Sequence, residues 1–168
     1  SLNDKILAIA LKNKPDFICI VPENRKEITT EGGLNLTKNK TKIKNIILKF
    51  KKNNIRTSLF INPNINDINL AKEFKVDCVE LHTGKLSNLI KERKKFKHEL
   101  KNIKDCCKLA KKLDLEVHAG HGLDYKTTTI LSKIKEIKEF NIGHFIIGES
   151  IIYGLKNIIE KFKKISNK

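Results

Sequence analysis

Several residue types are scarce or missing in this chain of 168 residues. It contains no methionine and no tryptophan, and aromatic residues make up only 6% of it. No apolar run approaches the ~18 residues that a membrane-spanning helix needs, so we expect no membrane partner. The first residues lack the basic segment and apolar stretch that mark a secretory signal peptide. Because position 1 is not methionine, we expect either a processed start or a chain that begins inside a longer protein.

Arginine is rare although the chain is strongly basic. The net charge is +16, yet only three of the 35 basic residues are arginines. Specific recognition of nucleic acid favours the planar fork of arginine, and binding of single strands uses aromatic platforms. The charge therefore indicates solvated, lysine-rich helix faces, such as residues 91–97, and we expect no specific nucleic-acid partner. A basic nucleic-acid-binding protein stays an alternative, since a positive field favours contact with phosphates.

The four cysteines are Cys19, Cys78, Cys106 and Cys107. They show neither Cys-x-x-Cys spacing nor a histidine at zinc-finger distance, so the sequence predicts no metal site. Cys19 and Cys78 lie inside apolar runs, which predicts small core residues. Reduced thiols are typical of the cytoplasm, where we expect this protein.

Apolar runs of strand length alternate with segments of helical periodicity along the chain. The predicted strands are residues 17–21, 57–61, 77–81, 115–119 and 142–147. The predicted helices are residues 3–13, 38–53, 64–74, 85–113 with a break near Lys101, 127–140 and 151–165. Strands that are apolar at nearly every position indicate a parallel sheet that helices bury on both faces. We expect residues 1–168 to form a single α/β domain.

Two architectures fit this alternation. One is an open, doubly wound sheet of five strands, and the other is a (β/α)8 barrel of which this chain supplies five βα units. No Gly-x-Gly-x-x-Gly motif follows the first strand, so the dinucleotide-binding version of the doubly wound sheet has no support. In both architectures the functional residues lie in loops at the carboxyl ends of the strands.

The loops and ends of the first and third strands hold candidate site residues. The first loop contains Thr29, Glu31 and the pair Gly32-Gly33, a combination through which backbone amides can approach a phosphate. Glu80 lies in the third apolar strand, where an ionised carboxylate is costly unless it is paired. This favours a Glu80 that faces a site. The alternative for the first loop is an ordinary turn that contains glycine. The alternative for Glu80 is a structural salt bridge.

The most informative stretch follows the fourth predicted strand. His121 lies between two glycines, whose lack of side chains lets a substrate come close to the imidazole. Histidine suits proton transfer near neutral pH, so we predict a catalytic His121 and a structural role for His118. Gly143 and His144 come at the start of the fifth predicted strand, in the region where barrels often hold a phosphate group.

Taken in order, several stretches resemble the pyridoxine 5'-phosphate synthases, the last enzymes of one vitamin B6 route. The matching stretches are residues 15–23, 29–34, 58–61, 80–84, 119–123 and 141–144. The pieces Thr-Thr-Glu-Gly-Gly, Ala-Gly-His-Gly-Leu and Asn-Ile-Gly-His are specific in combination, and the resemblance covers essentially the whole chain. It implies a (β/α)8 TIM barrel in which the five strands here are the fourth to the eighth. The first three strands, with a further catalytic histidine and glutamate, would then precede this chain.

The resemblance also implies an activity. The family condenses 3-amino-2-oxopropyl phosphate with 1-deoxy-D-xylulose 5-phosphate into pyridoxine 5'-phosphate, phosphate and water. It implies no metal or redox cofactor, a homo-octamer, and a cytoplasmic enzyme. By resemblance His121 is the proton donor, and Thr29 binds the deoxyxylulose phosphate.

Further site residues follow from the same resemblance. Gly122, Gly143 and His144 match positions that bind the aminooxopropyl phosphate. Glu80 and Glu31 are candidate pocket residues.

Other functions stay open beside the synthase. One is a different phosphate-binding TIM-barrel enzyme, such as an epimerase or an aldolase. An aldolase that works through a Schiff base needs a lysine at a strand end, and no predicted strand ends in one. The other is a non-catalytic, truncated remnant, because five strands cannot close an eight-stranded barrel. A remnant is expected to lose the strand-end motifs, which are intact here.

Overall fold

The computed structural model describes residues 1–22 and 32–166. The strands are β1 (Phe17–Ile20), β2 (Arg56–Ile61), β3 (Cys78–His82), β4 (Glu116–Gly120) and β5 (Ile137–Asn141). The helices are α1 (Asp4–Asn13), α2 (Lys40–Lys52), α3 (Ile65–Glu73), α4 (Gly84–Lys91), α5 (Lys97–Lys112), α6 (Tyr125–Leu131), α7 (His144–Tyr153) and α8 (Leu155–Ser166). Among the described residues, no helix has the length and apolar character needed to cross a bilayer.

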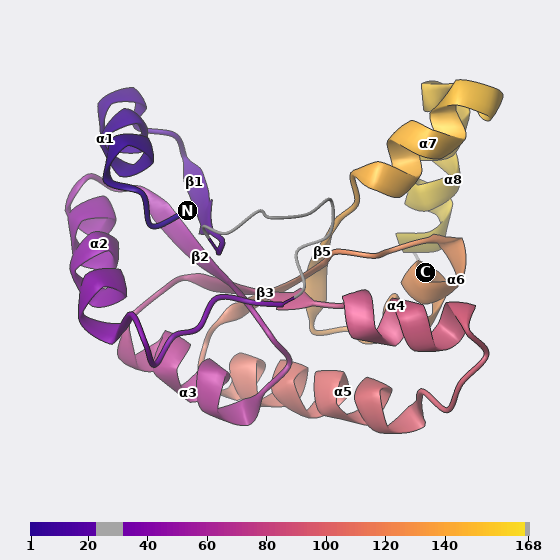
Figure 1. The fold of residues 1–168 in the computed structure, drawn as a ribbon, viewed down its shortest axis with the longest axis horizontal. Helices are drawn as coiled ribbons and strands as arrows, with labels where there is room; N and C mark the ends of the chain where they lie inside the picture. The colour runs from indigo at the N-terminus through magenta and orange to yellow at the C-terminus, as the bar shows by residue number, and fades with distance from the viewer. Residues whose placement is uncertain (23–31, 167–168) are drawn as a thin grey trace.

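The strands follow one another across the sheet in chain order. The order is β1-β2-β3-β4-β5, and every pairing is parallel. A doubly wound sheet reverses its strand order at a switch point, whereas successive strands of a barrel are always neighbours. Helices α1, α2, α3 and α5 lie in an arc outside the strands, in the same order (Figure 1). This α/β arrangement is consistent with the predicted part of a TIM barrel; the single domain over residues 1–168 stays a prediction.

The two faces of the sheet differ in chemistry, because successive side chains of a strand point to opposite sides. On the outer face, Leu59, Val79 and Val117 belong to the apolar core beneath the helices. The inner face carries Phe60, Glu80 and His118 in one row across the sheet. The prediction that both faces are apolar is therefore wrong for the inner face. A barrel wall explains the difference, since its helices cover only the outside.

The helices near the N-terminus begin and end close to the predicted positions. The side chain of Asn3 caps α1 by accepting a hydrogen bond from the backbone N–H of Lys5 at 3.0 Å. Helix α2 buries the side chains that share one helical face, which are Ile43, Ile46, Ile47 and Phe50. These residues pack against the outer face of the sheet as part of the core.

The helical stretch predicted over residues 85–113 breaks earlier than predicted. Helix α4 ends at Lys91 and α5 begins at Lys97, so the break does not lie near Lys101. Arg93 has a φ of +54°, a left-handed conformation that interrupts a right-handed helix. Lys91 and Lys95, which lie four residues apart, also carry like charges, and such a pair disfavours a helix.

The prediction for the fifth strand is wrong. It was placed at residues 142–147, but the strand is β5, and the helix predicted over residues 127–140 ends at Leu131. Strand β5 reads Ile-Lys-Glu-Phe-Asn and exposes three of its five residues, so it shows no continuous apolar run. The apolar run that follows it forms helix α7 instead. A short apolar run does not by itself distinguish a strand from a buried helix.

Helices α7 and α8 replace the single helix predicted over residues 151–165. Gly154 separates them with a φ of +80°, which glycine adopts without strain. No residue of α7 is buried, and Ile151 and Ile152 are 83% and 74% exposed. Strand β5 pairs only with β4 among the described residues. In a closed barrel a further strand pairs with such an edge.

Candidate active site

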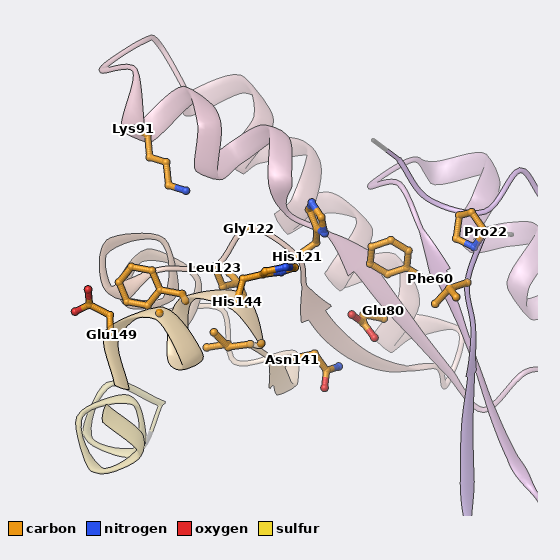
Figure 2. Close-up of a pocket in the computed structure, with 15 residues that line it drawn as sticks. Pro22, Phe60, Glu80, Lys91, His121, Gly122, Leu123, Asn141, His144 and Glu149 are labelled. Carbon is orange, nitrogen blue, oxygen red and sulfur yellow. The ribbon is translucent and has the colours of Figure 1, made fainter. Parts of the chain in front are cut away.

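A cavity of about 740 Å³ opens at the carboxyl ends of the strands. Figure 2 shows Phe60, Glu80, His121, Asn141 and His144 around it, contributed by β2, β3, the loop after β4, the end of β5 and the start of α7. Parallel α/β folds bind their ligands at this end of the sheet, and a concave pocket with a few convergent polar groups is typical of such sites.

The structure brings five of the seven predicted site residues to this one cavity. They are Glu80, His121, Gly122, Gly143 and His144. The other two, Thr29 and Glu31, lie outside the described residues. The correction to β5 changes how the site is built: Gly143 and His144 do not begin a strand but follow one, and His144 begins α7.

His121 occupies a strained turn at the end of β4. Its φ is +72°, and that of Gly122 is +73°. A left-handed conformation costs a residue other than glycine about 1–2 kcal/mol, and strain of this kind is found preferentially at functional sites. The turn directs the imidazole toward the cavity, where the two glycines beside it add no bulk (Figure 2).

Hydrogen bonds from the start of α4 hold this turn. The backbone N–H of Thr83 donates to the carbonyl oxygen of Gly120 at 2.8 Å. The Thr83 hydroxyl lies 2.9 Å from that oxygen and 2.7 Å from the carbonyl oxygen of His121, so one donor serves both. The Ser87 hydroxyl donates to the carbonyl oxygen of Gly122. The strained backbone is therefore fixed by side chains of the neighbouring βα unit.

The electrostatic surroundings of His121 favour its neutral form. Burial of the imidazole lowers the pKa of His121 from its ordinary value, and electrostatic repulsion from His82, His144 and Lys91 lowers this pKa further. The Lys91 ammonium also favours a bound anion in the cavity. A negative group in the cavity therefore stabilises the imidazolium form that can donate a proton.

Glu80 is the carboxylate nearest the centre of the inner face. Burial raises the pKa of Glu80 above its ordinary value, while hydrogen bonds from Cys19 and Asn141 oppose this shift. The Cys19 thiol donates to Oε2 of Glu80 at 3.6 Å, and burial, together with this carboxylate, raises the pKa of Cys19 to about 12. A Cβ at Gly120 would overlap the Glu80 carboxylate. Glycine at this position therefore makes room for the Glu80 carboxyl group.

The start of α7 lines the cavity and has backbone groups of the kind that suit an anion. The first backbone N–H groups of a helix have no partner within the helix and carry its positive dipole end. Gly143 precedes α7. Among the residues that the structure describes, no side chain caps the helix there and no atom lies within 4 Å of a Cβ placed on Gly143. The Lys91 side chain comes from α4 toward the same cavity (Figure 2). Sequence reasoning missed Lys91 because it lies in a basic run that was interpreted as solvated surface.

Comparisons with known proteins assign this chain to a family. A family model described as pyridoxal phosphate biosynthesis protein PdxJ matches residues 1–168. The chain belongs to the PdxJ family. The pyridoxine 5'-phosphate synthase of Pelagibacter ubique is 70% identical over 168 residues, which are 100% of this chain and 70% of the relative.

More distant PdxJ relatives that match this chain are also pyridoxine 5'-phosphate synthases. The pyridoxine 5'-phosphate synthase of Aliarcobacter butzleri is 43% identical over 187 residues, covering 98% of this chain and 72% of the relative. That of Zymomonas mobilis is 43% identical over 160 residues, covering 95% of this chain and 62% of the relative. Matches at this level over nearly the whole chain agree with the resemblance found from the strand-end motifs.

The four cysteines of this PdxJ chain lie in two strands and in helix α5. Of the two cysteines predicted as core residues, Cys78 is buried, whereas Cys19 is only half-buried and donates to Glu80. Cys106 and Cys107 are buried as well. All four thiols are free.

One group of side chains has the donor atoms of a metal site. Atoms of Cys78, Glu116 and His118 lie within 4.8 Å of one another toward the amino end of the strands. Glu116 also accepts from Arg56 at 3.1 Å and lies 2.8 Å from Nε2 of the buried His118. Burial raises the pKa of Cys78 to about 12, which disfavours the thiolate that binds metals. Glu116 instead forms an ion pair with Arg56 and a hydrogen bond with the buried His118, and these contacts are compatible with the structural role predicted for His118.

Backbone hydrogen bonds of Gly33 and Leu34 connect this segment of the PdxJ chain to the end of β2. The backbone N–H of Gly33 donates to Oδ1 of Asn62 at 2.9 Å, and the N–H of Leu34 donates to the carbonyl oxygen of Phe60 at 2.7 Å. A Cβ on Gly33 would overlap the backbone of Ile61 and Asn62. The residues that follow the predicted phosphate loop are therefore held beside Phe60, which lines the cavity.

Gly33→Ala is expected to lower the free energy of unfolding by about 1–3 kcal/mol, because an added atom in a closely packed place forces the backbone apart. Urea unfolding followed by circular dichroism measures this. Gly32→Ala is the matched control: a Cβ there lies 3.7 Å from the Asn62 side chain, an ordinary contact. Equal stability of the two variants would contradict the close contact at Gly33.

Proposed function

We propose that this chain carries the proton-donor and aminooxopropyl-phosphate half of a pyridoxine 5'-phosphate synthase site. One observation supports this most strongly. His121, Glu80 and the start of α7 converge on a single cavity in a chain 70% identical to a pyridoxine 5'-phosphate synthase. The reaction joins an amine and a ketone, releases water and one phosphate, and closes a pyridine ring.

His121 is the proton donor in this proposal. Loss of water from a carbon skeleton requires a proton on the departing oxygen, and a positioned acid contributes typically 10²–10⁴-fold to such a step. The two neighbouring glycines allow the substrate to approach the imidazole closely. The lowered pKa of the free His121 means that the donor form depends on the charge brought in by the substrate.

The phosphate of the aminooxopropyl substrate binds at Gly122, Gly143 and His144 in this proposal. Backbone N–H groups at the start of a helix suit a phosphate, and the His144 side chain adds a further donor. Lys91 lies on the opposite wall of the cavity and adds a positive charge. The proposed binding of the second substrate by Thr29, and a pocket role for Glu31, concern residues outside the described part of the chain.

Glu80 is proposed to exchange protons with the reacting carbon skeleton. Its carboxyl lies on the inner face beneath the imidazole of His121 (Figure 2). A group whose pKa is raised toward the working pH is an effective acid–base catalyst. The cavity thus offers a histidine and a carboxyl group of shifted pKa for successive proton transfers.

Bound inorganic phosphate is expected to raise the pKa of His121. A dianion beside the imidazole stabilises the protonated form, so the donor form persists to higher pH in the complex than in the free protein. As a consequence, kcat/KM falls with rising pH at a lower pH than kcat does. Proton–nitrogen NMR titration of the histidine rings with and without phosphate measures this shift. His98, exposed on α5, is the internal control, and an unchanged His121 pKa would contradict the phosphate site.

The test of the function is a product assay. The protein expressed from its complete gene is incubated with 1-deoxy-D-xylulose 5-phosphate and 3-amino-2-oxopropyl phosphate, and pyridoxine 5'-phosphate is measured by fluorescence and mass. Formation of this product supports the proposal, and its absence from a folded protein contradicts it. The homo-octamer and the cytoplasmic location implied by the resemblance are proposals as well, and light scattering after gel filtration tests the first.

A further inference from the structure

A second histidine lies directly against the proposed proton donor. His82 ends β3, and the centroid of its ring lies 4.7 Å from that of His121 with the two planes inclined by 21°. This is a stacked arrangement. The ring of His82 is almost completely buried, with 8% of the residue exposed, so it is a fixed surface for the more accessible imidazole of His121.

His82 is itself held in place from a further side. The ring of Phe60 meets it edge-on, with centroids 5.4 Å apart and planes inclined by 73°. A Cβ on Gly84 would lie 2.9 Å from Cε1 of His82 and 2.8 Å from Cδ2 of His121. The backbone at the start of α4 therefore closes over the edges of both imidazoles. These close contacts leave the two stacked rings little room to rotate.

The backbone and the ring of His121 are held by different groups. Thr83 and Ser87 make the hydrogen bonds to the carbonyl oxygens of the strained turn. His82 instead contacts the imidazole itself. Removing the His82 ring is therefore expected to free the imidazole of His121 while the turn that carries it stays in place.

We propose that His82 is a positioning residue, which holds the imidazole of His121 in the orientation needed for proton donation. The proposal rests on the proposed function, in which His121 is the donor. An acid acts only when its proton points at the departing oxygen, and a misplacement of about 1 Å can cost 10²-fold in rate. Stacked aromatic rings prefer a defined geometry, which restricts rotation of the His121 ring about its bond to Cβ.

Kinetics of three variants test the consequence for catalysis. His82→Ala removes the stacking surface and is expected to lower kcat by about ten- to hundredfold while KM changes less than about threefold. His82→Phe restores a flat ring and is expected to recover most of the lost kcat. His98→Ala, on the exposed side of α5, is the matched control and is expected to behave as the wild type. Unchanged kcat in His82→Ala, or equal loss in His82→Phe, overturns the proposal.

NMR of the His121 ring tests the contact without any enzymatic reaction. The ring current of His82 shifts the carbon-bound protons of His121, so His82→Ala is expected to move these resonances and His82→Phe to keep them displaced. Unmoved resonances in a His82→Ala variant that melts cooperatively overturn the stacking, whatever the activity. A wild type without synthase activity but with the expected NMR shifts would overturn the proposed function while supporting the placement of the ring.

Discussion

His121→Ala is expected to lower kcat of the synthase reaction by about 10²–10⁴-fold, the usual contribution of a positioned acid. The loss is expected in kcat rather than in KM. The groups at the start of α7 that are proposed to bind the substrate phosphate do not depend on the imidazole. Steady-state kinetics on the protein expressed from its complete gene measure both constants. His144→Ala is the contrasting variant. It is expected to raise KM for 3-amino-2-oxopropyl phosphate and to lower kcat less than His121→Ala does.

The backbone at position 121 calls for a second variant. Its φ of +72° strains alanine as it strains histidine, whereas asparagine adopts the left-handed region more readily than most residues. His121→Asn removes the imidazole while keeping the turn, and is expected to lose activity as strongly as His121→Ala. A kcat within tenfold of the wild type in His121→Asn would show that another group donates the proton.

Glu80→Gln is expected to change activity and stability in opposite directions. Turnover is expected to fall by at least about 10²-fold, because an amide cannot exchange protons as a carboxyl group does. The melting temperature at pH 7 is expected to rise. Activity assays and thermal unfolding of the same preparation measure the two effects together.

The sign of the stability change follows from the raised pKa of Glu80, caused mainly by burial. A group whose folded-state pKa is raised contributes stability that is fully present below its unfolded-state pKa and is lost as the pH rises through the folded-state pKa. At pH 7 the buried carboxylate therefore lowers the free energy of unfolding, and an uncharged amide removes this cost. Near pH 4 the gain from Glu80→Gln is expected to shrink.

Glu92→Gln is the matched control for this prediction. Glu92 forms an exposed ion pair with Lys94 at the end of α4, a kind of pair that contributes little to stability. Its variant is expected to keep both the activity and the melting temperature. A lower melting temperature for Glu80→Gln at pH 7 would contradict the view that the buried carboxylate costs stability.

The accuracy of the sequence predictions varied with the local pattern. The strands β2, β3 and β4 were found because each lies in a short, mainly apolar run followed by a polar loop. β5 was missed because it lies at the edge of the described sheet, where its exposed Lys138 and Glu139 break any apolar pattern. The apolar run after it was assigned to a strand, although it forms the exposed helix α7.

The sequence by itself determined the alternation of strands and helices, the family resemblance, and the residues at the strand ends. These features are local, since each depends on a short stretch of neighbouring residues. The pattern of apolar runs alone did not distinguish the doubly wound sheet from the barrel wall, and only the family resemblance favoured the barrel. The strand order agrees with the barrel wall, and it follows from pairing of each strand with the next, which joins residues far apart in the chain.

Only the tertiary structure decided which side chains face one another. The stacking of His82 on His121 joins residues 39 positions apart, and the contact of Glu80 with Cys19 joins residues 61 positions apart. Burial and neighbouring charges shift the pKa values of Glu80 and His121, and both arise from packing across strands. The residue types were legible in the sequence, but their acid–base properties come from the low-dielectric surroundings that the folded sheet creates.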